Sequence, residues 1–190
     1  MGAFEHVVSL LSFVYALAIA HLLLTVAGLI RRSERVRFSW FHAYWTANAL
    51  LVIVVDWISF WDLHTVESWN IGLIFMMIAI ALIDYLQAAL VCPELPDEGA
   101  IDLAAFHATQ ARRYIGAFLA ATTMALVANT VLGRAYDIAA WGAQNAAVIP
   151  LFVIALTATV VRRRWVDIVA PILLIGIWVY YLVDLQGALH

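Results

Sequence analysis

The chain has 190 residues, of which 66% are hydrophobic and 12% are charged, and its formal net charge is -3. A soluble domain has roughly 45 to 50% apolar and about 25% charged residues, so this composition excludes a soluble globular protein. The arginines sit in short turns between apolar segments, which argues against nucleic acid as a partner. With Cys92 as the only cysteine, neither an internal disulfide nor a thiolate metal cluster can form.

Six apolar segments are each long enough to cross a bilayer, which requires about 20 mostly apolar residues. The sequence therefore predicts an all-α, polytopic membrane helix bundle that forms one integral domain over residues 1–190. The predicted spans are about 4–30, 40–61, 69–91, 113–132, 138–161 and 165–189.

The connectors between these spans are short and carry helix-ending signals. A basic loop, 31–37, follows the first span, and Pro93 ends the third because proline cannot continue a helix. The acidic connector 93–99 comes next, and Asp102 is a suitable N-cap for the helix that carries the fourth span. Pro150 lies near the middle of the fifth span, where proline bends or breaks a helix.

Nine of the ten arginines fall on one side of the predicted spans, and Arg134 alone lies on the other. Arginine beside a span end is retained on the cytoplasmic side, so both termini are predicted to be external. In a bacterial inner membrane they would be periplasmic. The inner arginines would contact anionic lipid. Spans one to three and four to six then run in opposite orientations, as in a 3+3 inverted repeat.

Polar side chains within the spans are the candidate functional residues, because burying them in hydrocarbon costs free energy. Counting residues from the span centres places one group in the outer half of the bundle, where it could line a polar path. Its members are Ser12, Asp56, Asn129, Asn145 and Asp184.

A second, deeper pair lies on the cytoplasmic side of the span centres. His21 and Asp84 fall at matching depth, so the imidazole could donate to the carboxylate, and Gln87 shares the face of Asp84. A histidine paired with an acid in a low dielectric can relay protons. The alternative is a hydrogen-bonded pair that only holds helices together.

A metal site at the external boundary is a further hypothesis. Glu5, His6 and His64, with Asp62 and Glu67, offer the imidazole and carboxylate ligands that suit zinc or a related divalent ion. No other cofactor is expected. Bis-histidine ligation of haem requires two histidines at matching depth, which the predicted spans do not supply. Retinal and pyridoxal phosphate require a lysine, which this chain does not contain.

Three classes of function fit these features, and the lack of any hydrolase, phosphate-loop or zinc-protease motif argues against an enzyme. The first is a small channel or transporter for a proton, cation or small polar solute, which would form homo-oligomers because one short chain gives a thin wall around a path. The second is an accessory or assembly subunit that binds a partner membrane subunit. The third is a metal-binding or cofactor-binding membrane protein.

Overall fold

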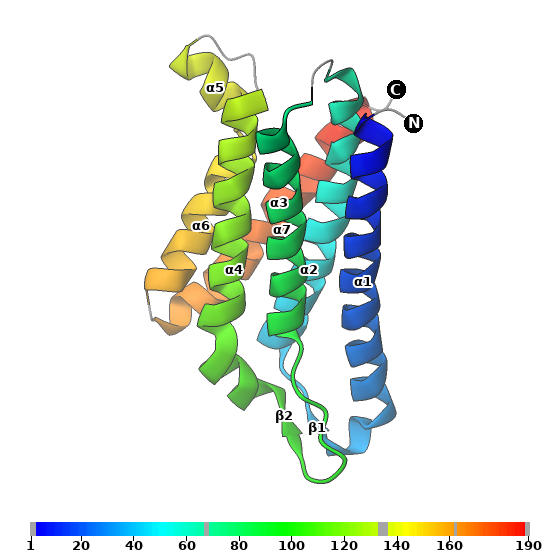
Figure 1. Cartoon of the computed structure of the whole chain (residues 1–190). Coiled ribbons are helices and arrows are strands. Elements are labelled where there is room, and N and C mark those ends of the chain that lie inside the picture. The colour runs from blue at the N-terminus through cyan, green and yellow to red at the C-terminus, as the bar shows by residue number, and fades with distance from the viewer. Residues whose placement is uncertain (1–2, 67–68, 133–136, 162, 189–190) are drawn as a thin grey trace. The chain divides into compact units, whose positions relative to one another are not determined.

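The computed structural model describes residues 3–66, 69–132, 137–161 and 163–188, which form seven α-helices and one pair of two-residue strands (Figure 1). Five helices are long and apolar enough to cross a membrane, and a bent pair of shorter helices passes the same test as a sixth span. The chain is thus an all-α bundle of membrane-spanning type. It divides into two compact units, 1–117 and 118–190, with the boundary inside one long helix.

The first unit is built on three helices that pack against one another: α1 (Ala3–Arg31), α2 (Trp40–Ser59) and α3 (Ile71–Val91). Side-chain caps begin two of them, since Ser39 accepts from the His42 amide and Asn70 from the Leu73 amide. A 3₁₀ helix, η2 (Phe60–Thr65), follows α2, and α3 ends at Val91 before Cys92 and Pro93, as predicted.

A small clasp closes one end of this unit, and the sequence did not reveal it. After α1 come the 3₁₀ turn η1 (Ser33–Arg35) and strand β1 (Val36–Arg37), which pairs in parallel with β2 (Ile101–Asp102) (Figure 1). Arg37 binds the Asp102 carboxylate at 3.1 Å, and Arg35 donates to the Asp97 carbonyl at 2.6 Å. Arg35 and Arg37, predicted to contact lipid, thus bind Asp97 of the acidic connector and Asp102 of β2.

The helix that carries the predicted fourth span, α4, runs from Leu103 to Leu132 and includes about ten residues before the predicted span. Asp102 caps it as predicted: one carboxylate oxygen accepts from the Ala104 and Ala105 amides, both at 2.9 Å. The cap and the strand before it set the start of the helix, whereas the hydropathy pattern detects only the apolar part farther along. In the first unit Phe106, in the first turns of α4, packs edge to face on the His42 ring of α2.

The Asp102 cap gives a pH-dependent prediction. Hydrogen bonds from the Ala105 and Ala104 amides, with the nearby Arg37 charge, hold the pKa of Asp102 below its ordinary value. A carboxylate with a lowered folded-state pKa stabilises the fold above its unfolded-state pKa of about 3.9 and loses that contribution as the pH falls through the folded-state value. We therefore expect the Ala104 and Ala105 amides to exchange hydrogen faster below about pH 4 than a pH-matched reference amide.

Two variants separate the charge from the cap. Asp102→Asn keeps a capping oxygen, so it should retain most of the protection while removing the acid-dependent loss. Asp102→Ala removes the cap and should speed exchange at these amides at every pH. Equal acid sensitivity in wild type and Asp102→Asn, measured by hydrogen exchange and mass spectrometry, would contradict the assignment.

The second unit contains the rest of α4 with α5 (Ile138–Gln144), α6 (Val148–Val160) and α7 (Arg164–Ala188). The predicted fifth span is two helices that meet at an angle of 76°. The break lies at 145–147 rather than at Pro150, which instead occupies the first turn of α6. Proline is tolerated there because the first amides of a helix have no partner within it.

Candidate functional site

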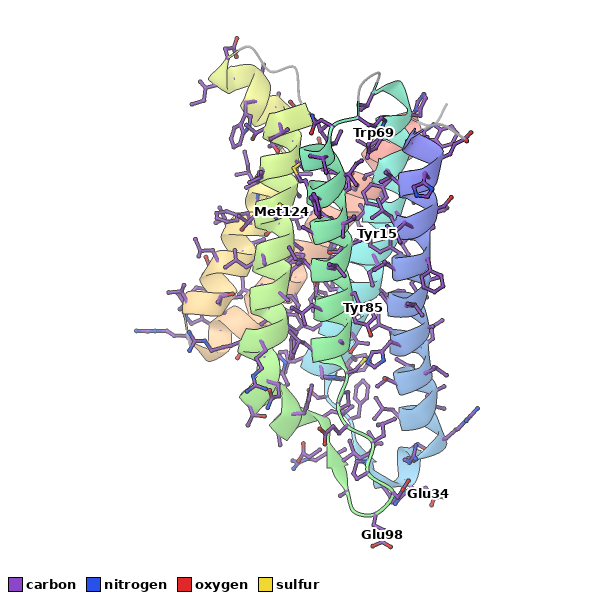
Figure 2. The ribbon with its side chains drawn as sticks, in the orientation of Figure 1. Tyr15, Glu34, Trp69, Tyr85, Glu98 and Met124 are labelled. Carbon is purple, nitrogen blue, oxygen red and sulfur yellow. The ribbon has the colours of Figure 1, made fainter. Side chains whose placement is uncertain are left out.

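A buried acid on α3 is the centre of the candidate site. Asp84 is fully buried, and the Tyr15 hydroxyl of α1 donates to its Oδ2 at 3.1 Å. The carboxyl of Asp56, on α2, lies within hydrogen-bonding reach of the Asp84 carboxyl and remains partly exposed. Figure 2 shows Tyr15 on α1 pointing into the bundle. The helices α1, α2 and α3 thus each contribute one oxygen-bearing side chain to the site.

Helical spacing explains how these side chains reach one another. Tyr15 belongs to a fully buried stripe on α1 at Leu11, Tyr15, Ala18 and Leu22, spaced three or four residues apart. Asp84 belongs to the corresponding buried stripe on α3, whose other members are Leu73, Met77, Ile80, Ala81, Gln87, Ala88 and Val91. Apolar neighbours above and below therefore carry both polar groups into the interior.

The contact between the two carboxyl groups has a chemical consequence. Two carboxylates in contact cannot both be ionised, and carboxylate oxygens alone can only accept hydrogen bonds. The Oδ1 atom of Asp84 is buried and meets no donor among the described residues. The side chains that interact with the Asp84 carboxyl are those of Asp56 and Tyr15, and neither of them is positively charged. A proton held between Asp56 and Asp84 satisfies this geometry.

Tyr15 is the site residue that the sequence reasoning missed. A tyrosine in the apolar middle of a span is unusual, because the amphipathic ring is enriched at the membrane interface. Its hydroxyl needs a partner when it is buried. The position of Tyr15 in the middle of the first predicted span is therefore the sequence signal that could have identified it. Gln87, predicted on the face of Asp84, is also buried, and its Oε1 has no hydrogen-bond partner among the described residues.

The predicted hydrogen bond between His21 and Asp84 is not formed. His21 lies on the exposed face of α1, where its backbone carbonyl accepts from the Thr25 hydroxyl. The prediction also separated Asp56 and Asp84 in depth, whereas the structure brings them together. The depth estimate assumed that all spans are centred at one level, but the axial register of packed helices follows from how their side chains interlock.

The remaining predicted path residues fall into separate groups. In the first unit Ser12 accepts a hydrogen bond from the Trp57 indole at 3.1 Å. In the second unit the Asn129 amide donates to the Asn145 Oδ1 at 3.0 Å, and Asn145 donates to the Trp141 carbonyl at 2.9 Å. Asp184 lies in α7, but its side chain is outside those that the structure describes.

Asn145 is fully buried at the break between α5 and α6, so its hydrogen bonds hold the break in place. We expect Asn145→Leu to destabilise the protein by about 1 to 2 kcal/mol, because it removes two bonds and leaves the Asn129 amide without this partner. SDS-induced unfolding followed by circular dichroism measures the change. The control is Thr123→Val, an exposed hydroxyl that bonds the Leu119 carbonyl of its own helix. Equal stability of both variants would contradict this role.

The structure does not assemble the predicted metal ligands. Glu5 and His6 are exposed on α1, and His64 is exposed in η2 with its ring bonded to the Trp61 carbonyl. Within the described parts of the chain no three histidine, cysteine, aspartate or glutamate side chains converge on one point. The side chains of Asp62 and Glu67 lie outside the described set.

The fold and this site define an α-helical bundle of membrane-spanning type with a carboxyl pair among three of its helices, in which Asp84 is buried and Asp56 is partly exposed. Comparisons of the chain with protein-family models, with curated proteins and with solved structures return no match.

Proposed function

We propose that the protein is a small transporter or channel that moves protons across the membrane and binds them at the Asp56 and Asp84 pair. The observation that carries this proposal is the contact between two carboxyl groups inside the bundle, with Tyr15 as the hydrogen-bond donor. Ionisable groups at membrane depth are costly and commonly mark ion pathways or proton relays.

The surroundings of the pair favour a proton over other cargo. A site for a metal cation gathers several oxygen ligands around the ion, whereas here the two carboxyls and the hydroxyl are joined directly to one another. Asp84 has no exposed surface, and Asp56 keeps part of its surface open. Asp56 is therefore the entry side of the pair, and Asp84 is the inner acceptor.

The proposal includes the topology and assembly expected from the sequence. The arginines would lie on the cytoplasmic side of a bacterial plasma membrane, with both termini periplasmic, and the short chain would form homo-oligomers. In support, the basic loop and the acidic connector lie at one end of the first unit, joined by β1 and β2. An inverted repeat of three plus three spans belongs to the same proposal. Reporter fusions at both termini test the orientation.

Proton flux into proteoliposomes is the direct test of the function. Vesicles that contain potassium and an internal pH dye are diluted into sodium-free medium, and valinomycin then sets an inside-negative potential. We expect the purified protein to acidify the lumen faster than empty vesicles do. No excess acidification would contradict the proposal, and excess flux only after sodium is added would assign the site to a metal cation.

An accessory or assembly subunit is the second candidate. The bond between Tyr15 and Asp84 joins α1 to α3, which is also what a packing device requires. Purification in mild detergent separates the two candidates, because an accessory subunit should bring a stoichiometric partner chain with it. A homo-oligomer that conducts protons would exclude this second role.

A further inference from the structure

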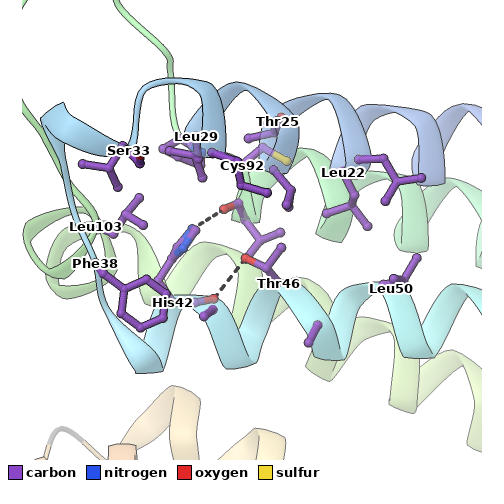
Figure 3. Close-up of a pocket in the computed structure, with 18 residues that line it drawn as sticks. Leu22, Thr25, Leu29, Ser33, Phe38, His42, Thr46, Leu50, Cys92 and Leu103 are labelled. Carbon is purple, nitrogen blue, oxygen red and sulfur yellow. Dashed lines mark hydrogen bonds between the residues drawn. The ribbon is translucent and has the colours of Figure 1, made fainter.

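An apolar cavity of about 510 Å³ lies in the first unit, away from the carboxyl pair and close to the basic loop (Figure 3). Its walls come from α1, from α2 and from the end of α3. Leu22 and Leu50 lie at one end of the cavity, and Ser33 and Phe38 lie at the other. Leu103, beside the clasp, completes the second end.

Three polar side chains in the middle of the wall, those of Thr25, His42 and Thr46, are hydrogen-bonded within the protein. The His42 Nε2 is hydrogen-bonded to the Val91 carbonyl at 2.8 Å, and the Thr46 hydroxyl donates to the His42 carbonyl at 3.0 Å (Figure 3). The Thr25 hydroxyl donates to the His21 carbonyl at 3.0 Å. Because these side chains already have hydrogen-bond partners, the cavity favours the binding of a hydrocarbon chain over that of a polar ligand.

The length of the cavity corresponds to one leaflet of a bilayer. From Leu22 to Ser33 the chain of α1 and its end rises about 16 Å, at about 1.5 Å per residue. The hydrocarbon core of a bilayer is about 30 Å thick, so this length is close to half of it. Leu23, Ile30 and Phe38 line the cavity and are themselves exposed, which gives it a lateral opening on the apolar surface.

The charge at the polar end indicates which lipid fits. Arg31 and Arg32 lie in the chain between Ile30 and Ser33, two residues that line the cavity. Arg32 lies 3.7 Å from the Asp97 carboxylate, whereas Arg31 is exposed. Basic side chains at the headgroup level attract anionic lipids. We propose that this cavity holds one acyl chain of an anionic phospholipid from the leaflet on the arginine side, with its phosphate beside Arg31.

Cys92 provides a built-in probe, because it lines the cavity and is the only cysteine of the chain. Burial raises the pKa of its thiol, so its reaction with N-ethylmaleimide is followed at mildly alkaline pH. In nanodiscs of phosphatidylcholine we expect this reaction to slow, and to reach a plateau, as phosphatidylglycerol is added. An equal rate in both lipids would overturn the proposal, and this measurement uses the wild-type chain.

Native mass spectrometry of matched variants supplies the second readout. Wild type should retain one phosphatidylglycerol per chain, and Ala43→Phe should lose it because the ring fills the cavity. Ala20→Phe, on exposed surface of α1 outside the cavity, should retain it. Arg31→Gln should weaken the preference for phosphatidylglycerol over phosphatidylcholine about five-fold. Retention of the lipid by Ala43→Phe, or an unchanged preference in Arg31→Gln, would overturn the proposal.

Discussion

Asp84→Asn is expected to abolish the proton flux that the wild-type protein supports. Asparagine has nearly the same shape as aspartate, so it can still accept the hydrogen bond from Tyr15, but its amide does not take up and release a proton. The reconstituted variant should therefore acidify vesicles no faster than empty vesicles do, while its helix content stays at the wild-type level.

Asp56→Asn should have the same effect, because the two carboxyls hold a proton together. The double variant should then be no worse than either single one, since residues that act as a unit are not additive. Asp167→Asn is the matched control, because Asp167 is an exposed acid in α7. Wild-type flux in Asp84→Asn, or an equal loss in Asp167→Asn, would remove the carboxyl pair from the mechanism.

Tyr15→Ala is expected to destabilise the protein by about 2 to 5 kcal/mol, the range for removing a large buried side chain. Tyr15 has only 1% of its surface exposed and packs on the Phe60 ring at a centroid distance of 5.5 Å. In a bilayer, helix association depends mainly on such packing, so a cavity between α1 and its neighbours is poorly compensated. SDS-induced unfolding in mixed micelles measures the loss.

Tyr15→Phe isolates the hydrogen bond from the packing. It keeps the ring and removes the donor to Asp84, and such bonds between membrane helices contribute less than about 2 kcal/mol. We expect a small loss of stability together with a reduced, but not abolished, proton flux. An equal loss of stability in Tyr15→Phe and Tyr15→Ala would show that the hydroxyl, rather than the packing, holds these helices together.

Several features of the fold follow from local sequence alone. Hydropathy is summed residue by residue along one segment, so the membrane class and the approximate spans are determined without any knowledge of neighbours. The Asp102 cap and the end of α3 before Pro93 are equally local, because each depends on hydrogen bonds within a few residues. The same reasoning identified Asp56 and Asp84 as costly, and therefore notable, residues.

The composition of the candidate site required the tertiary structure. Tyr15 meets Asp84, and His21 lies on the exposed face, because of the way α1 is rotated about its axis. Both faces of α1 are apolar, so the sequence does not indicate which of them turns inward. Pairing of Asp56 with Asp84 depends on the axial register of α2 and α3. Residue counting from span centres cannot supply that register, because it follows from the packing of side chains on both helices.

The same division holds for the whole chain. By itself the sequence determined the helical membrane class, the approximate spans and the helix signals at Asp102 and Pro93, since these depend on short-range free energies. Only the tertiary structure decided the carboxyl pair, the clasp of β1 with β2 and the break held by Asn145. Each of these is a contact between segments distant in sequence or between helix faces, and its formation depends on the packing of all the neighbours around it.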